Sequence, residues 1–381
     1  MNIRKINNRI RMSFRIGLLN IFLMLCLAMS YISTQGLAFA QQNDQQTPLD
    51  PVTLQLKWKH QFQFAGYYAA IEKGYYREAG LDVALREAQP DEVTADAVLN
   101  GQAEFGIASS DLVLLRGAGK PVVVLAPIFQ HSPLIFLVPE DSGMTSIHDL
   151  KGRPVMLETH AEELLAYLMT EGLSPQDVTL VPHTSDVSKI LDGTVSAMSA
   201  YLTDEPFLLE QSGIRYLWFT PRSAGIDFYG DTLFTTEKQV KKHPDRVRRF
   251  REASLKGWDY ALRHPEEMVD LILSQYSRRH SREHLLFEAE KTAKLILPDV
   301  VEVGYSNPGR WRHIAQTYTT SDMMPHDFST SGFLYEHGVK INLRKFYIAL
   351  SIALGIVAIL SVAVVWITRV NRKIRKQARS L

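Results

Sequence analysis

The stretch VTLQLKWKHQFQFAGYYAAIEKGYYREAGLDVALREA, residues 52–88, decides the fold class because it contains one complete strand, helix and strand unit. Polar and apolar residues alternate in VTLQLKW, and Tyr68, Ile71 and Tyr75 then recur at helical spacing before Gly80. A second strand follows as LDVALREA, and the alternation continues through AEFGIA and PVVVLAPIF. The pattern predicts an α/β fold with a mostly parallel sheet covered on both faces by helices.

The same stretch is unusually rich in rings and amides where its first strand ends. Trp58, Gln61, Phe64 and Tyr68 lie within eleven positions of one another. A buried strand favours Val and Ile, and a solvated loop contains few aromatic residues. This composition is typical of a pocket wall that stacks on a flat polar ligand.

About 300 residues separate the apolar segments at the two ends of the chain, a length at which one core usually divides into two lobes. We expect a linker at 41–51, the first part of lobe 1 at 52–138, lobe 2 at 139–232, and a return to lobe 1 with C-terminal helices at 233–340.

Residues 1–40 have the pattern of a secretory signal peptide, with a basic flank, an apolar run and the small-residue exit AFA. An uncleaved anchor helix is the alternative interpretation. Cys26, the only cysteine, lies inside the apolar run. A cleaved chain would therefore contain no disulfide, no thiolate nucleophile and no cysteine-bound metal.

Residues 346–367 form a stretch of 22 uncharged residues, long enough to cross about 30 Å of hydrocarbon as a helix. The tail at 368–381 is basic and contains no acidic residue. Because positive residues remain inside, we expect a single-pass inner-membrane protein with its binding domain in the periplasm and its C-terminus in the cytoplasm.

Polar residues follow five of the predicted strands at their C-terminal ends, where ligands bind in open parallel sheets. Tyr229 and Asp231 lie where the chain would cross back between the lobes and could contribute to the same cleft. For Ser110 and Asp111 the alternative is a helix N-cap, and for Glu205 a surface turn. The candidates at the strand ends are Trp58, Gln61, Phe64, Ser110, Asp111, Gln130, Thr159 and Glu205.

Motifs of common enzymes are absent from the sequence. It contains no phosphate-binding loop, no H-E-x-x-H, no G-x-S-x-G and no glycine-rich dinucleotide turn. The formal net charge of +1 provides no overall field that would select nucleic acid. We therefore expect a small-molecule binder, with no cofactor and no metal, rather than an enzyme.

Four stretches together resemble a known family of periplasmic proteins. They are LKWKHQFQFAGYYAAIEKGYYREAGLDV, GQAEFGIASSDLVLLRGAGKPVVVLAPIFQHSPLIFLV, LKGRPV and YLTDEPFLLEQSG. The resemblance is to the substrate-binding family of thiamine-pyrimidine precursor binders, with sulfonate and nitrate binders and the fungal thiamine pyrimidine synthase as more distant relatives. It covers residues 52–336 and implies a type II periplasmic binding protein fold with two crossovers between its lobes.

The resemblance also implies roles for individual residues. Trp58 would stack on the ligand ring, with Gln61, Phe64 and Tyr68 beside it. The first lobe would donate or accept hydrogen bonds through Ser110, Asp111 and Gln130, and the second through Glu205.

Three functions remain open on the sequence. The chain could be a membrane-anchored receptor, because a binding module followed by a membrane helix resembles the sensor half of bacterial signalling receptors that act through a kinase or cyclase. It could instead deliver its ligand to an ABC permease. Synthase activity is the third, although the sequence lacks the cysteine-rich motif of the fungal synthase.

Overall fold

The computed structural model of the chain divides into two compact units, Met1–Leu334 and Tyr335–Leu381. The predicted signal peptide and Thr159 lie outside the described residues. The structure describes residues 48–89, 93–158, 161–184, 187–326, 328–336 and 343–377.

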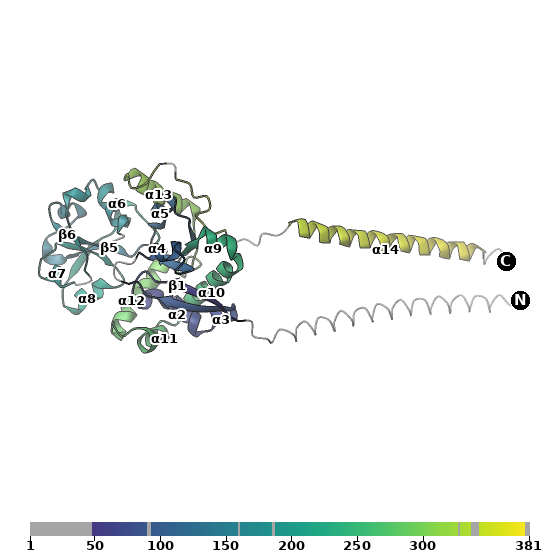
Figure 1. The fold of residues 1–381 in the computed structure, drawn as a ribbon, viewed down its shortest axis with the longest axis horizontal. Helices are drawn as coiled ribbons and strands as arrows, with labels where there is room; N and C mark the ends of the chain where they lie inside the picture. Colours follow the sequence, from purple (N-terminus) through teal and green to yellow (C-terminus); the bar gives the residue numbers. More distant parts are fainter. Residues whose placement is uncertain are drawn as a thin grey trace. The chain divides into compact units, whose positions relative to one another are not determined.

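The first unit contains two five-stranded sheets, one in each lobe (Figure 1). The sheet of lobe 1 has the order β2-β1-β3-β10-β4, in which β10 is antiparallel to both of its neighbours. The chain reaches β10 only after completing the second lobe. The strands of this sheet are β1 (Asp50–Gln55), β2 (Leu81–Arg86), β3 (Phe105–Ala108), β4 (Val122–Pro127) and β10 (Thr232–Thr236).

The sheet of lobe 2 has the equivalent order β7-β6-β8-β5-β9, with β5 antiparallel to β8 and β9. Each lobe is therefore a mostly parallel sheet with one reversed strand next to its edge. This is the two-lobed fold of periplasmic binding proteins. The strands are β5 (Leu134–Pro139), β6 (Pro154–Leu157), β7 (Thr179–Pro182), β8 (Ala197–Tyr201) and β9 (Tyr216–Phe219).

Helices connect the strands and complete lobe 1 after β10. Those of the first part of lobe 1 are η1 (Phe62–Phe64), α2 (Ala65–Glu72), α3 (Tyr75–Glu78), α4 (Thr94–Leu99) and α5 (Leu112–Gly117). Those of lobe 2 are η2 (Glu140–Ser142), η3 (Ile147–Leu150), α6 (Glu162–Thr170), η4 (Pro175–Asp177), α7 (Ser188–Leu191), α8 (Glu205–Gln211) and η5 (Pro221–Ala224). The helices after β10 are α9 (Glu237–Lys242), α10 (Pro244–Arg263), α11 (Pro265–Leu271), η6 (Ile272–Tyr276), α12 (Arg282–Ile296) and α13 (Pro308–Thr320).

The lobe boundary differs from the one expected at residue 138. Strand β5 pairs with β8 and β9, so residues 134–138 belong to lobe 2 and the first crossover precedes Leu134. Residues 134–138 are all apolar and all buried. Such a run fits the centre of either sheet, so its sequence does not indicate which sheet it joins. Strand β1 likewise begins at Asp50, inside the expected linker, where Arg246 pairs with the Asp50 carboxylate.

Two glycines allow helices α2 and α10 to approach closely behind the first sheet. A Cβ on Gly257 would lie 2.1 Å from the carbonyl oxygen of Gly66, and one on Gly66 would lie 2.1 Å from the Trp258 ring. The Trp258 side chain is fully buried and meets the rings of Tyr67 and Phe129 edge-on. Any side chain at either glycine would force the two helices apart.

Gly257→Ala should lower the free energy of unfolding by about 1–3 kcal/mol, even though alanine favours a helix over glycine by up to about 1 kcal/mol. The added methyl group collides with backbone rather than with a movable side chain. Urea unfolding followed by circular dichroism measures the change. Glu252→Ala, at an exposed position of the same helix, is the control and should change stability by less than about 0.5 kcal/mol. Equal stabilities of the two variants would contradict the close helix contact.

The second unit contains one long helix, α14 (Leu343–Gln377). Among the described residues it is the helix long and apolar enough to cross a membrane, with a mean hydropathy of 2.7 in its apolar window and none of that window buried. The stretch expected to span the membrane, 346–367, lies within it. The helix continues into the basic residues at its C-terminal end.

Candidate ligand-binding cleft

The C-terminal ends of strands from both sheets meet at Lys57. This residue follows β1, and its Nζ donates a hydrogen bond to Ser109 Oγ (2.6 Å), directly after β3. The same Nζ donates to the hydroxyl of Tyr201, the last residue of β8 in lobe 2. It also lies 3.5 Å from Asp231 Oδ1, in the second crossover. A single ammonium group thus connects both lobes and the segment between them.

The charges at this junction are largely withdrawn from water. The side chain of Lys57 is 18% exposed and that of Asp231 is 2% exposed. Burial disfavours the ammonium form of Lys57, whereas Tyr201 and Asp231 favour it, and the net effect raises its pKa. Burial raises the pKa of Asp231, against the opposing effect of Lys57 and of the hydrogen bond that Gln63 Nε2 donates over 2.7 Å. Lys57 is therefore a fixed cation at the junction of the two lobes.

Two further carboxyl groups face this junction from lobe 2. Glu158 directly follows β6, and burial raises its pKa to about 7 even though the Lys57 ammonium lowers it. Glu205 begins α8, and its Oε2 accepts a hydrogen bond from the Tyr201 backbone nitrogen (2.8 Å). Burial, followed by the nearby Asp204, raises the pKa of Glu205 well above its ordinary value. At neutral pH these groups can donate as well as accept hydrogen bonds.

The predicted aromatic wall separates into one exposed ring and two buried rings. Trp58 is 39% exposed directly after β1, whereas Phe64 and Tyr68 are fully buried in lobe 1. Tyr68 stacks on Tyr276 with ring centroids 4.1 Å apart, and its hydroxyl lies 2.9 Å from His60 Nδ1. Trp58 is thus the ring of the three that is exposed at the surface.

The predicted polar residues of lobe 1 have partners within the protein. Gln61 Oε1 accepts from Arg279, the Ser110 hydroxyl donates to the Tyr229 carbonyl, and Gln130 Nε2 donates to the Tyr305 carbonyl. Asp111 occupies the N-cap position of α5, but its side chain makes no capping hydrogen bond. The contact of these four residues with a ligand stays a prediction.

The two crossovers form a hydrogen-bonded ribbon between the lobes. The nitrogen of Ile128 donates to the Asp231 carbonyl (2.7 Å), and that of Ser132 donates to the Phe228 carbonyl (2.9 Å). A Cβ on Gly230 would lie 2.9 Å from side-chain carbons of both Phe129 and Pro133, so a glycine is required where the segments cross. The predicted hinge residues Tyr229 and Asp231 are part of this ribbon.

Arg310 of α13 binds both crossovers at once. Its Nη1 donates to the Gln130 carbonyl (2.7 Å) and its Nε to the Asp227 carbonyl (2.9 Å). Its guanidinium also pairs with the Asp227 carboxylate and lies over the Tyr229 ring, 4.6 Å from the ring centroid. Tyr229 also packs against Trp311, with centroids 5.1 Å apart. Arg310 therefore fixes the spacing of the segments about which the lobes would move.

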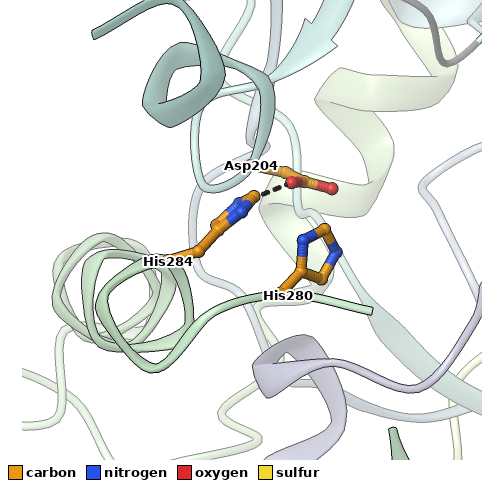
Figure 2. A group of neighbouring side chains, drawn as sticks. All are labelled: Asp204, His280 and His284. Carbon is orange, nitrogen blue, oxygen red and sulfur yellow. Dashed lines mark ion pairs between the residues drawn. The ribbon is translucent and has the colours of Figure 1, made fainter. Parts of the chain in front are cut away.

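Sequence reasoning missed Lys57, Glu158, Tyr201 and Arg310. Lys57 and Glu158 each adjoin a residue that the sequence singled out, so their position at a strand end was visible. The contact of Lys57 with Tyr201, 144 positions away, was not. A metal-capable group, Asp204, His280 and His284, was also missed (Figure 2). Its H-x-x-x-H spacing is apparent in the sequence, whereas Asp204 joins it only through the fold.

The family model described as NMT1/THI5 like matches residues 61–268, more than half of the chain. The chain belongs to this family. The match covers Gln61, the crossovers and most of both lobes, but not Lys57 or Trp58.

Three similar proteins have named functions. A riboflavin-binding protein, RibY, of Chloroflexus aurantiacus is 27% identical over 60% of this chain and 67% of its own length. A formylaminopyrimidine-binding protein of Halalkalibacterium halodurans is 26% identical over 67% of this chain and 78% of its own. A 4-amino-5-hydroxymethyl-2-methylpyrimidine phosphate synthase of Saccharomyces cerevisiae, THI13, is 27% identical over 57% and 68% of the two chains.

The solved structure of the alkanesulfonate-binding protein SsuA from Xanthomonas axonopodis has the same fold. It superposes with a TM-score of 0.59, covers 76% of this chain and 99% of its own, and is 14% identical. This similarity supports the periplasmic binding protein fold of the present chain. It carries no information on the ligand that the chain binds.

Glu158→Gln should increase the free energy of unfolding at pH 8 by about 3 kcal/mol and at pH 5 by less than about 1 kcal/mol. The folded-state pKa of Glu158, about 7, lies above the ordinary value of 4.5. The native chain therefore loses stability as the pH rises from 4.5 to 7, and glutamine removes this loss.

Urea unfolding at the two pH values measures the effect of Glu158→Gln. Glu72→Gln, at an exposed position of lobe 1, is the matched control and should have no effect at either pH. An equal change for Glu158→Gln at pH 5 and pH 8 would show that the carboxyl of Glu158 does not titrate in this range.

Proposed function

We propose that this protein is a membrane-anchored periplasmic solute-binding protein that closes its two lobes on a flat, pyrimidine-like heteroaromatic ligand. The observation that carries the proposal is the junction at Lys57, where a fixed cation joins lobe 1, Tyr201 of lobe 2 and the buried carboxylate of Asp231. Next to it, Trp58 presents an exposed ring at the exit of β1.

The chemistry of the junction supports a ring with a polar edge. An indole ring gains about 0.5–1.5 kcal/mol from stacking beyond the area that it buries. Lys57 donates hydrogen bonds to ring carbonyl oxygens, and Glu158, with its pKa near 7, can bind ring nitrogens or amino groups in either protonation state. The relatives named for riboflavin and formylaminopyrimidine bind ligands that share such a pyrimidine-type edge.

We further propose that the binding unit is the input module of a receptor. Helix α14 supports a membrane attachment, and its basic C-terminal end supports a cytoplasmic location for that end. A signalling kinase or cyclase would then be the partner. Delivery of the ligand to an ABC permease is the second candidate, and the names of the riboflavin and formylaminopyrimidine binders favour binding over synthesis.

Trp58→Ala should weaken binding of the ligand by about 1–3 kcal/mol, which is roughly 5–150-fold in dissociation constant. Isothermal titration with flavins, aminopyrimidines and alkanesulfonates measures the effect. Lys59→Ala, at the exposed position next to it, is the matched control and should bind as the native chain does. Equal affinities of native chain and Trp58→Ala for a bound pyrimidine would remove the ring from the site.

The receptor and transport proposals predict different proteins that copurify with this chain. Detergent-solubilised full-length chain should retain a kinase or cyclase if it is a receptor, and permease subunits if it is a transport component. Retention of a permease that is released by ligand would contradict the receptor proposal.

A further inference from the structure

Asp204, His280 and His284 converge from the two lobes on one point (Figure 2). Asp204 precedes α8 in lobe 2, and His284 lies in the first turn of α12. Helix α12 belongs to lobe 1, because its Glu288 carboxylate accepts hydrogen bonds from the backbone nitrogens of Phe62 and Gln63. One candidate ligand atom from each of the three side chains lies within 4.8 Å of the other two. The group therefore spans the lobes.

The contact between His284 and Asp204 has an unusual geometry. The Nε2 of His284 lies 2.8 Å from Asp204 Oδ1, yet neither atom makes a hydrogen bond of acceptable direction. His284 is 3% exposed, and its ring stacks on Phe207 of α8 with centroids 4.5 Å apart. Two atoms bound to one ion at about 2.0–2.2 Å lie roughly 3 Å apart without pointing at each other. The observed contact fits that arrangement better than an ordinary ion pair.

The surrounding charges also favour a cation. Besides Asp204, the carboxyl groups of Glu205 and Glu288 border the cluster. Among the described residues the Arg279 guanidinium also lies nearby, and its Nη2 donates to Gln61 Oε1.

His280 lies beside His284 in this cluster. Its ring meets the His284 ring edge-on, with centroids 4.1 Å apart.

We propose that Asp204, His280 and His284 form a binding site for one divalent transition-metal ion, most suitably Zn²⁺, that clamps the two lobes together. Two imidazoles and one carboxylate are the ligand types of Zn²⁺ and disfavour Mg²⁺ and Ca²⁺. With three protein ligands, a zinc site of this type would take water as its fourth ligand.

Because the ligands come from both lobes, the site is complete only in the closed form. The metal site itself is independent of the proposed ligand. If the lobes also close on that ligand, which rests on the proposed function, metal and ligand must raise each other's affinity by the same factor.

The test is a titration of the chelator-treated full-length chain in detergent with Co²⁺ and then Zn²⁺. The native chain should bind one equivalent of Co²⁺ with the visible absorption of a four-coordinate ion, and Zn²⁺ should displace it. Asp204→Asn and His280→Ala should each weaken binding by at least about 100-fold. His243→Ala, at an exposed position of lobe 1, is the matched control and should bind normally.

Circular dichroism verifies that each variant is folded, and His280 is the least buried of the three side chains, so at least one variant should retain the native fold. Absence of stoichiometric binding by the folded native chain would overturn the proposal and leave only an ion pair. Unchanged binding by both folded variants would overturn it equally. Metal binding without any bound organic ligand would support the site even if the proposed solute were wrong.

Discussion

The contact of Lys57 with Asp231 and Tyr201 is the interaction on which the closed arrangement of this protein depends. Removing an ammonium and a carboxylate from water costs several kcal/mol for each ion. Their attraction offsets this cost only where further hydrogen bonds satisfy the remaining N–H groups and oxygen lone pairs of the two ions. Ser109 and Gln63 provide those hydrogen bonds. The segments after β1 and β3, the end of β8 and the second crossover are thereby held by a single cation. A ligand that binds between the lobes would meet polar groups that are already positioned.

The hinge explains how such a junction can open without losing the fold. The two crossovers are hydrogen-bonded to each other, and Gly230 permits their close approach. Arg310 holds both crossovers and covers Tyr229. Rotation of the lobes about this ribbon would separate Lys57 from Tyr201 and Asp204 from His284, while leaving each sheet intact. The polar contacts at Lys57 act together with one buried apolar cluster that includes Val124 and Phe234 of lobe 1 and Phe136 and Leu164 of lobe 2.

The sequence predicted the parts of this account that depend on local pattern. The alternation of strands and helices is a property of short windows, and the two sheets confirm it. The role of Trp58, Ser110 and Asp231 in ligand binding stays a prediction. Which sheet β5 joins is decided by its pairing with β8 and β9, far along the chain, and so the lobe boundary was misplaced. Phe64 and Tyr68 lie at the start of α2, whose close packing buries both rings, and composition alone could not separate them from Trp58. Tyr201, which contacts Lys57, and Asp204, which contacts His284, both come from lobe 2, and no spacing rule connects either pair.

The most direct test of lobe closure is the distance between the lobes with and without ligand. Spin labels at cysteines replacing Glu72 in lobe 1 and Gln211 in lobe 2, with Cys26→Ser, allow it to be measured by double electron–electron resonance in the full-length chain. The account predicts a broad or long distance distribution without ligand that becomes short and narrow when a pyrimidine-like ligand is added. In a Lys57→Met chain the distribution should remain broad. A distance that is the same with and without a bound ligand would contradict closure about the Lys57 junction.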